Sequence, residues 1–443
     1  MDENLLHDVV AAALKAGADA AEAVLAERQS LSITVRMDEL EEVEREEARD
    51  LGVRVFVGQR QATVSGSDMS ADARARLIER VVAMARLAPE DPYAGLAPSD
   101  RLARNDGPDL DLFDPVEPTA DQLEAQARLA EQAARKIAGV TNSDGGSASW
   151  SSSRWRLVTS AGFSGSHQAT GSSLSASAIA GEGANMERGG EGRSTRWRAD
   201  LPSAGSIGAE AGRRAVSRLG ARKIDSTTAP VIFENRLATS LFGPLIGAVS
   251  GPAIARGTSF LKDKLGKAVF GTHITLTEDP HRRRGLGSSG FDDEGVANQR
   301  RALIDQGVLT TWLLNTSSAR QLGLETTGHA SRGLAGAPGV ATTNVTIEPG
   351  EDDLAALMRQ AGSGLLVTSM FGPSLNANTG DWSVGVSGDW FAGGERAYPV
   401  TEITVAGNLI DIYRRVIAGS DLEIRGSANS PSLLIDALAI AGR

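Results

Sequence analysis

The sequence feature that most constrains the fold of this chain is a series of runs in which apolar and polar residues alternate. Few helical patterns separate these runs. In "LGVRVFVG", residues 51–58, Val53, Val55 and Val57 share one face of a strand. The preceding run "SLSITVRMDELEEVERE" alternates in part, and "QATVSGS" follows after a short turn. These runs predict an antiparallel meander with one solvent-exposed face. Since strands and helices do not alternate regularly along the chain, we expect an α+β fold and not a doubly wound parallel sheet.

Helices and further strands are expected on either side of one polar stretch, "ARKIDSTTAP" at 221–230. We take this stretch as the boundary between an N-terminal α+β domain, residues 1–222, and a β-rich C-terminal domain, residues 226–443. Both should have mainly antiparallel sheets with flanking helices. Apolar spacing predicts helices at 4–16, 70–88, 119–138, 206–219, about 236–250 and 351–361. Strands are expected at 230–234, 272–277, 308–315, 341–348, 364–371 and at the C-terminal end.

Composition excludes several classes of function. The formal charge of −11 disfavours sequence-independent binding of nucleic acid, which depends on Lys and Arg neutralising phosphates. The chain has no Cys, so disulfides, thiolate metal ligands and Cys nucleophiles are excluded. The sequence shows neither an apolar run long enough to span a bilayer nor the basic start of a signal peptide, so we expect a cytoplasmic protein without a membrane partner.

Motifs that carry chemistry in other proteins are weak here. "GLGSSG", residues 285–290, follows "DPHRRR" instead of a buried strand, so it does not indicate a dinucleotide site. His273 and His281, with the carboxylates of Asp292, Asp293 and Glu294, offer a possible metal hydrolase site. The simpler interpretation is two structurally bonded histidines and a polar turn.

Several motifs, in order, give the chain a family resemblance. "GFDDEGVANQRRALIDQGVL", "TNVTIEPG", "VTEITVAGNLIDIYRRV" and "SPSLLIDALAIAG" resemble the TldD/PmbA family, as do the N-terminal "GADAAEAVLAERQSLSITVR" and "LGVRVFVGQRQATVSGSD". The resemblance covers nearly the whole chain and is weakest between about residues 90 and 225. It implies one of two sister subunits. The TldD type is a zinc peptidase with H-E-x-x-x-H on a helix, completed by a Cys, and the PmbA (TldE) type lacks these residues.

The segment "SLFGPLIGAVSG", residues 240–251, falls where the metal-binding helix of that family would lie. Compared with the sister pattern, Phe242 and Gly247 replace the two His residues, and Gly243 replaces the Glu. No His, Glu or Asp occurs between 235 and 260, so shifting the alignment does not restore the motif. Gly243, Gly247 and Gly251 recur every four residues, a spacing that predicts close packing of the helix against another backbone.

The resemblance therefore implies a non-catalytic, PmbA/TldE-type subunit of a heterodimeric zinc peptidase that degrades or processes unfolded or short peptides. It implies no metal in this chain and zinc in the H-E-x-x-x-H sister subunit. The alternatives are a free-standing binding or regulatory protein, and the metal hydrolase using His273 and His281. In the loop "TTGHASRG", Thr327, Gly328, His329 and Arg332 are the candidates for contact with peptide or partner.

Overall fold

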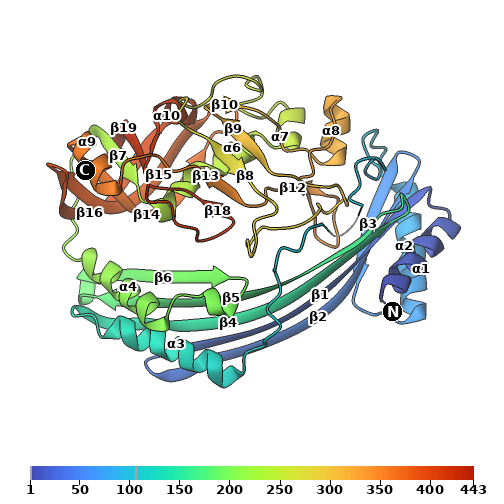
Figure 1. Cartoon of the computed structure of the whole chain (residues 1–443), viewed down its shortest axis with the longest axis horizontal. Helices are drawn as coiled ribbons and strands as arrows, with labels where there is room; N and C mark the ends of the chain where they lie inside the picture. Colours follow the sequence, from blue (N-terminus) through green and yellow to red (C-terminus); the bar gives the residue numbers. More distant parts are fainter. Residues whose placement is uncertain (1, 105–106) are drawn as a thin grey trace.

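One long antiparallel sheet forms the N-terminal half and curves around the C-terminal half (Figure 1). The computed structural model describes residues 2–104 and 107–443. The six strands lie in the spatial order β3 (Arg60–Gly66), β2 (Glu39–Val57), β1 (Ala20–Arg36), β4 (Val140–Thr159), β5 (Ser164–Ala180) and β6 (Glu187–Thr195). Pairing of β1 with β4 joins the first three strands to the last three, so both sets belong to one sheet.

Four helices cover one face of this sheet. They are α1 (Asp2–Lys15), α2 (Ala71–Leu87), α3 (Ala120–Arg135) and α4 (Ala204–Ser217). Ala21, Ala23 and Leu25 of β1 pack with α1 and α2, and Leu31 and Ile33 of the same strand pack with α3 and α4. These strand positions are an even number of residues apart and so point to one side. The other face, which carries Glu22 and Val24, is turned toward the C-terminal half.

Small residues bring α3 and α4 close together. Thr119 caps α3 by accepting a hydrogen bond from the Gln122 amide, in a reciprocal capping box. A Cβ atom at Gly212 would lie 2.7 Å from the Ala134 carbonyl oxygen, so only glycine fits this contact. The helix pair therefore packs backbone to backbone over the sheet.

A closed ring of strands forms the centre of the C-terminal half. The strand order is β16 (Glu395–Asn408), β15 (Asp381–Ala392), β14 (Ser363–Leu375), β7 (Thr227–Phe233), β19 (Leu433–Ala441) and β17 (Ile417–Ala418). Pairing of β16 with β19 closes the ring. Strands β7 and β14 pair in parallel. The interior holds a large apolar cluster to which β7, β14, β15, β16 and β19 all contribute.

A second, smaller sheet and short helices complete this half. The sheet has the order β10 (Val308–Leu309), β9 (Arg301–Asp305), β8 (Leu276–Glu278), β13 (Val345–Ile347) and β18 (Ala428–Asn429). A separate pair joins β11 (Ala330–Ser331) to β12 (Gly339–Val340). The helices are α5 (Asn235–Ala238), α6 (Gly243–Ala248), α7 (Gly251–Ala255), α8 (Thr316–Leu322), α9 (Leu354–Ala361) and α10 (Leu409–Arg415). Short 3₁₀ turns occur at Gly183–Asn185, Arg198–Asp200 and Thr239–Leu241.

The predicted α+β class with antiparallel sheets is confirmed, while some predicted elements are wrong in extent. The single helix expected at about 236–250 is a series of short helices, because Pro244 and Pro252 each begin a new helical segment. The strand expected at 308–315 is limited to β10, since the backbone of Leu313 pairs with Val249 and Gly251 instead. Within the described residues, no helix combines the length and the apolar character needed to cross a membrane.

Candidate functional site

An apolar cavity of about 1040 Å³ lies inside the C-terminal half, against the short helices that follow β7. One wall carries Phe242, Gly243 and Gly247, the three positions singled out from the sequence. The opposite walls come from β14 and β15 and from the small sheet, through residues such as Trp382 and Val345. A cavity of this size and lining suits apolar side chains of a ligand.

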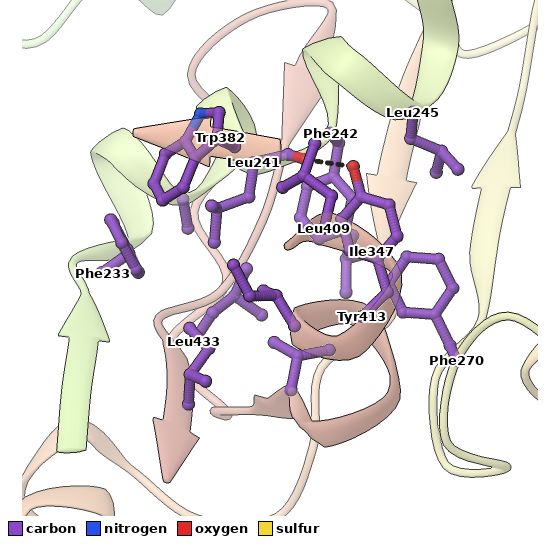
Figure 2. Packing of buried hydrophobic residues seen from close by; sticks show 14 of the residues in the cluster. Phe233, Leu241, Phe242, Leu245, Phe270, Ile347, Trp382, Leu409, Tyr413 and Leu433 are labelled. Carbon is purple, nitrogen blue, oxygen red and sulfur yellow. Dashed lines mark hydrogen bonds between the residues drawn. The ribbon is translucent and has the colours of Figure 1, made fainter. Parts of the chain in front are cut away.

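Phe242 belongs to an aromatic stack. Its ring lies 6.4 Å from the ring of Tyr413 and 6.1 Å from that of Phe270, and the Tyr413 and Phe270 rings are 4.6 Å apart. Figure 2 shows the Tyr413 hydroxyl donating a hydrogen bond to the Leu241 carbonyl, at 2.8 Å. Burial raises the pKa of Tyr413, so its hydroxyl stays protonated and donates. The stack holds the helical segment in place. The phenyl ring of Phe242 has no group that could take part in acid–base or metal chemistry.

Gly243 and Gly247 face open space. A Cβ atom added at either position would meet no atom within 4 Å. The close packing predicted for these two glycines is therefore wrong. Gly251 is closely packed, but against side chains and not against a backbone. An added Cβ there would lie 2.6 Å from the Ser318 Cβ atom and 2.8 Å from a Leu314 methyl group.

The residues around the cavity do not fit a zinc ion. Zinc in proteins is held by Cys, His, Asp or Glu, and none of these side chains lines the cavity. Across residues 2–104 and 107–443, no group of three or more such side chains is placed to hold a metal. His273 instead forms a hydrogen bond through Nε2 with the Val416 carbonyl, at 2.9 Å.

The carboxylates of the "DDEG" turn accept hydrogen bonds from backbone amides. Asp292 accepts hydrogen bonds from the amides of Glu294, Val296 and Ala330, each at 2.9 Å. Glu294 accepts from the Thr316 amide at 2.8 Å. Burial, together with the charge of Glu294, raises the pKa of Asp292 well above its usual range. The structure therefore does not join these carboxylates to His273 and His281 as a metal hydrolase would require.

Three of the four candidate contact residues of the 327–332 loop are buried, and Thr327 is half-buried. His329 is buried, and its Nε2 lies 2.6 Å from the Glu278 carboxylate, while its Nδ1 lies 2.8 Å from the Thr327 hydroxyl. Gly328, also buried, has φ +74°, which favours glycine. Arg332 pairs with Glu22 on the long sheet. In this structure the four residues connect parts of the protein, and their contact with a peptide or partner stays a prediction.

Glu22, Arg54 and Arg332 form a buried ionic cluster that the sequence analysis does not predict. Glu22 pairs with both Arg54 and Arg332, and the exposed fraction of each of the three side chains is 2% or less. The sequence contained a signal, because Arg54 interrupts the apolar run "GVRVFV" and Glu22 interrupts "AEAVLA". A charge within such a run is either exposed or paired, and only the fold identifies its partner.

Comparison with known proteins shows similarity along the whole chain. Models of PmbA/TldA metallopeptidase domains match residues 21–85 (domain 1), 113–219 (central domain) and 226–442 (C-terminal domain). The chain is 38% identical to metalloprotease PmbA of Escherichia coli O157:H7 over 444 residues, covering 99% of this chain and 96% of the relative. It is 36% identical to a PmbA homologue of Haemophilus influenzae, covering 97% of this chain and 94% of that protein.

Solved structures share the fold. A crystal structure from Bacteroides thetaiotaomicron, described as a candidate modulator of DNA gyrase, is 28% identical with a TM-score of 0.91, over 99% of this chain and 98% of the other. The structure of TldE from Thermococcus kodakarensis, 19% identical, has a TM-score of 0.85 over 99% of this chain and all of the other, and its likeness concerns the fold alone.

Proposed function

Because this chain belongs to the PmbA/TldD family of metallopeptidases, we propose that it is the non-catalytic subunit of a heterodimeric, TldD/TldE-type zinc peptidase. The sister subunit carries the H-E-x-x-x-H motif and the zinc ion. The substrates are unfolded or short peptides, and the complex works in the cytoplasm.

The observation that carries this proposal is the cavity wall formed by Phe242, Gly243 and Gly247. The helical segment lies beside a large cavity, while its side chains offer no metal ligand and no general base. A zinc peptidase needs both a bound metal and a group that accepts a proton from water. In this chain the same wall can only shape and enclose the space in which a peptide lies.

Co-expression with an H-E-x-x-x-H sister from the same genome tests the proposal. We expect a one-to-one complex by native mass spectrometry, zinc in the complex, and no zinc in this chain alone after dialysis. Hydrolysis of unstructured peptides should require both chains and should stop when a chelator is added.

Two results would count against the proposal. About one zinc ion per isolated chain, with peptide hydrolysis, would make this chain an enzyme in its own right. Failure to pair with the sister at micromolar concentration would favour a free-standing binding protein.

A further inference from the structure

A second, polar cleft lies where the end of α4 meets the C-terminal ring of strands. It has a volume of about 180 Å³, and we call it the arginine cleft. Its lining consists of Glu210, Arg213, Arg214, Ser217, Arg218, Glu234, Arg236, Thr368 and Arg396. Five arginines and two glutamates thus face one small space, in a chain whose formal charge is −11.

The carboxylates around the cleft do not neutralise all of these cations. Arg213 and Arg214 share Glu210, at 2.8 and 3.0 Å. Arg214 also pairs with Glu191, a carboxylate that Arg193 and Arg425 share. Within the described residues, Arg218 has no carboxylate at ion-pair distance, and its Nη1 donates only to the Arg188 carbonyl, at 2.6 Å. Arg218 is half-buried, so its charge is partly removed from water without an anionic partner.

The remaining two cations have one carboxylate each. Arg236 lies 3.2 Å from Glu234, and Arg396 lies 3.0 Å from Asp389. The Nε of Arg236 is buried and has no hydrogen-bond partner among the described residues. Protein atoms enclose this nitrogen, so it is out of a ligand's reach. The cleft instead offers an oxyanion its excess positive charge and the remaining N–H groups of Arg218.

Arg236 lines both the arginine cleft and the apolar cavity, so the two spaces are neighbours on either side of one side chain. Its Nη2 donates to the Thr368 carbonyl at 2.7 Å, which holds the side chain between the two spaces. A ligand that fills both spaces has an apolar part and an anionic end. A free phosphate would satisfy the cleft and leave the apolar walls unused.

We propose that the arginine cleft binds the C-terminal carboxylate of a peptide whose apolar side chains occupy the neighbouring cavity. The assignment of the ligand as a peptide rests on the proposed function. A carboxylate is planar and accepts paired hydrogen bonds from a guanidinium, and the small cleft has room for such an end group. The cleft thus selects peptides that end near the cavity over those that continue through it.

Binding of two matched peptides to the full-length chain tests the proposal. Each is a short peptide of Val, Leu and Phe with a fluorescent dye at its N-terminus, and one ends in a free carboxylate while the other ends in an amide. Fluorescence anisotropy should show the free acid binding roughly tenfold more tightly, because ionic hydrogen bonds to arginine are about twice as strong as neutral ones. The preference should weaken as salt is added.

Substitution of Arg218 locates the effect. In Arg218→Gln the two peptides should bind with equal affinity, and the amide peptide should bind as it does to the unchanged chain, which also shows that the variant is folded. Arg218→Lys keeps the charge and should keep part of the preference. Arg80→Gln, at an exposed position of α2 away from the cleft, is the matched control and should change neither affinity.

Three outcomes would overturn the inference. The first is equal binding of acid and amide, and the second is a preference that survives in Arg218→Gln. The third is Arg218-dependent binding of inorganic phosphate without a preference for the free acid, which would make the cleft a phosphate site. A chain that pairs with its sister and supports hydrolysis but lacks the preference contradicts only this inference, whereas a chain with the preference that does not pair contradicts only the subunit proposal.

Discussion

At the scale of single residues, the three positions 242, 243 and 247 differ in what their side chains do. Phe242 contributes to packing through its aromatic stack, and the two glycines contribute space to the cavity. The same glycine spacing continues to Gly251, which is in tight contact with α8. Gly247 therefore has room for a side chain, whereas Gly251 does not. Substitution of each by alanine should have opposite effects on stability.

Gly247→Ala should stabilise the protein by about 0.5–1 kcal/mol, because alanine loses less backbone entropy in a helix and its methyl group enters open space. Gly251→Ala should destabilise it by about 1–3 kcal/mol, because the methyl group would meet Ser318 and Leu314. Urea unfolding of the two variants measures both effects. A cost at Gly247 equal to that at Gly251 would show that the cavity wall is closely packed.

At the scale of elements, local sequence predicted the secondary structure better than it predicted the site. The period of two in β2 and the periodic apolar residues of α2 and α3 are local patterns, and the structure has these elements. Apolar spacing predicts one helix at about 236–250, whereas Pro244 and Pro252 divide the segment because each begins a new helix. The sequence does not predict the cavity or the arginine cleft, because residues far apart in sequence form each of them. Phe242 and Trp382 line the cavity, and Arg236 and Thr368 line the cleft.

The "DDEG" turn gives the protein a dependence on pH. Burial raises the pKa of Asp292, Asp293 and Glu294. When a carboxyl has a higher pKa in the folded protein than in the unfolded chain, the folded protein binds its proton more tightly. This stabilises the folded protein at pH values below the unfolded pKa, and the stabilisation is lost as the pH rises through the folded pKa. Lowering the pH from neutral toward the ordinary carboxyl pKa of about 4 should therefore increase the contribution of this turn to the free energy of unfolding.

Asp292→Asn removes the carboxyl whose pKa is raised most. In this variant the free energy of unfolding should increase less when the pH is lowered over that range. Urea titrations at a series of pH values measure the slope. Asp381→Asn is the control, because hydrogen bonds from Asn408 and Thr379 lower the pKa of that exposed carboxyl, and its contribution is lost only at more acid pH. Parallel pH curves for Asp292→Asn and the unchanged protein would contradict the role of the turn.

At the scale of the whole molecule, the ionic cluster of Glu22, Arg54 and Arg332 joins the long sheet to the C-terminal half. Glu22 and Arg54 belong to β1 and β2, and Arg332 directly follows β11. The Arg332 amide also donates to Asp293 in the "DDEG" turn, at 2.8 Å. Contacts of this kind fix how the curved sheet sits against the C-terminal half.

Arg332→Ala should lower the free energy of unfolding by about 1–3 kcal/mol, because Glu22 loses one of its two buried charged partners and keeps only Arg54. Arg443→Ala breaks an exposed ion pair with Asp225, whose side chains are 69% and 82% exposed, and should cost no more than about 1 kcal/mol. Urea unfolding compares the two variants, and hydrogen exchange of the β1 amides reports whether the sheet separates locally from the C-terminal half. If Arg332→Ala unfolds at the same urea concentration as Arg443→Ala and leaves β1 equally protected, the cluster does not hold the two halves together.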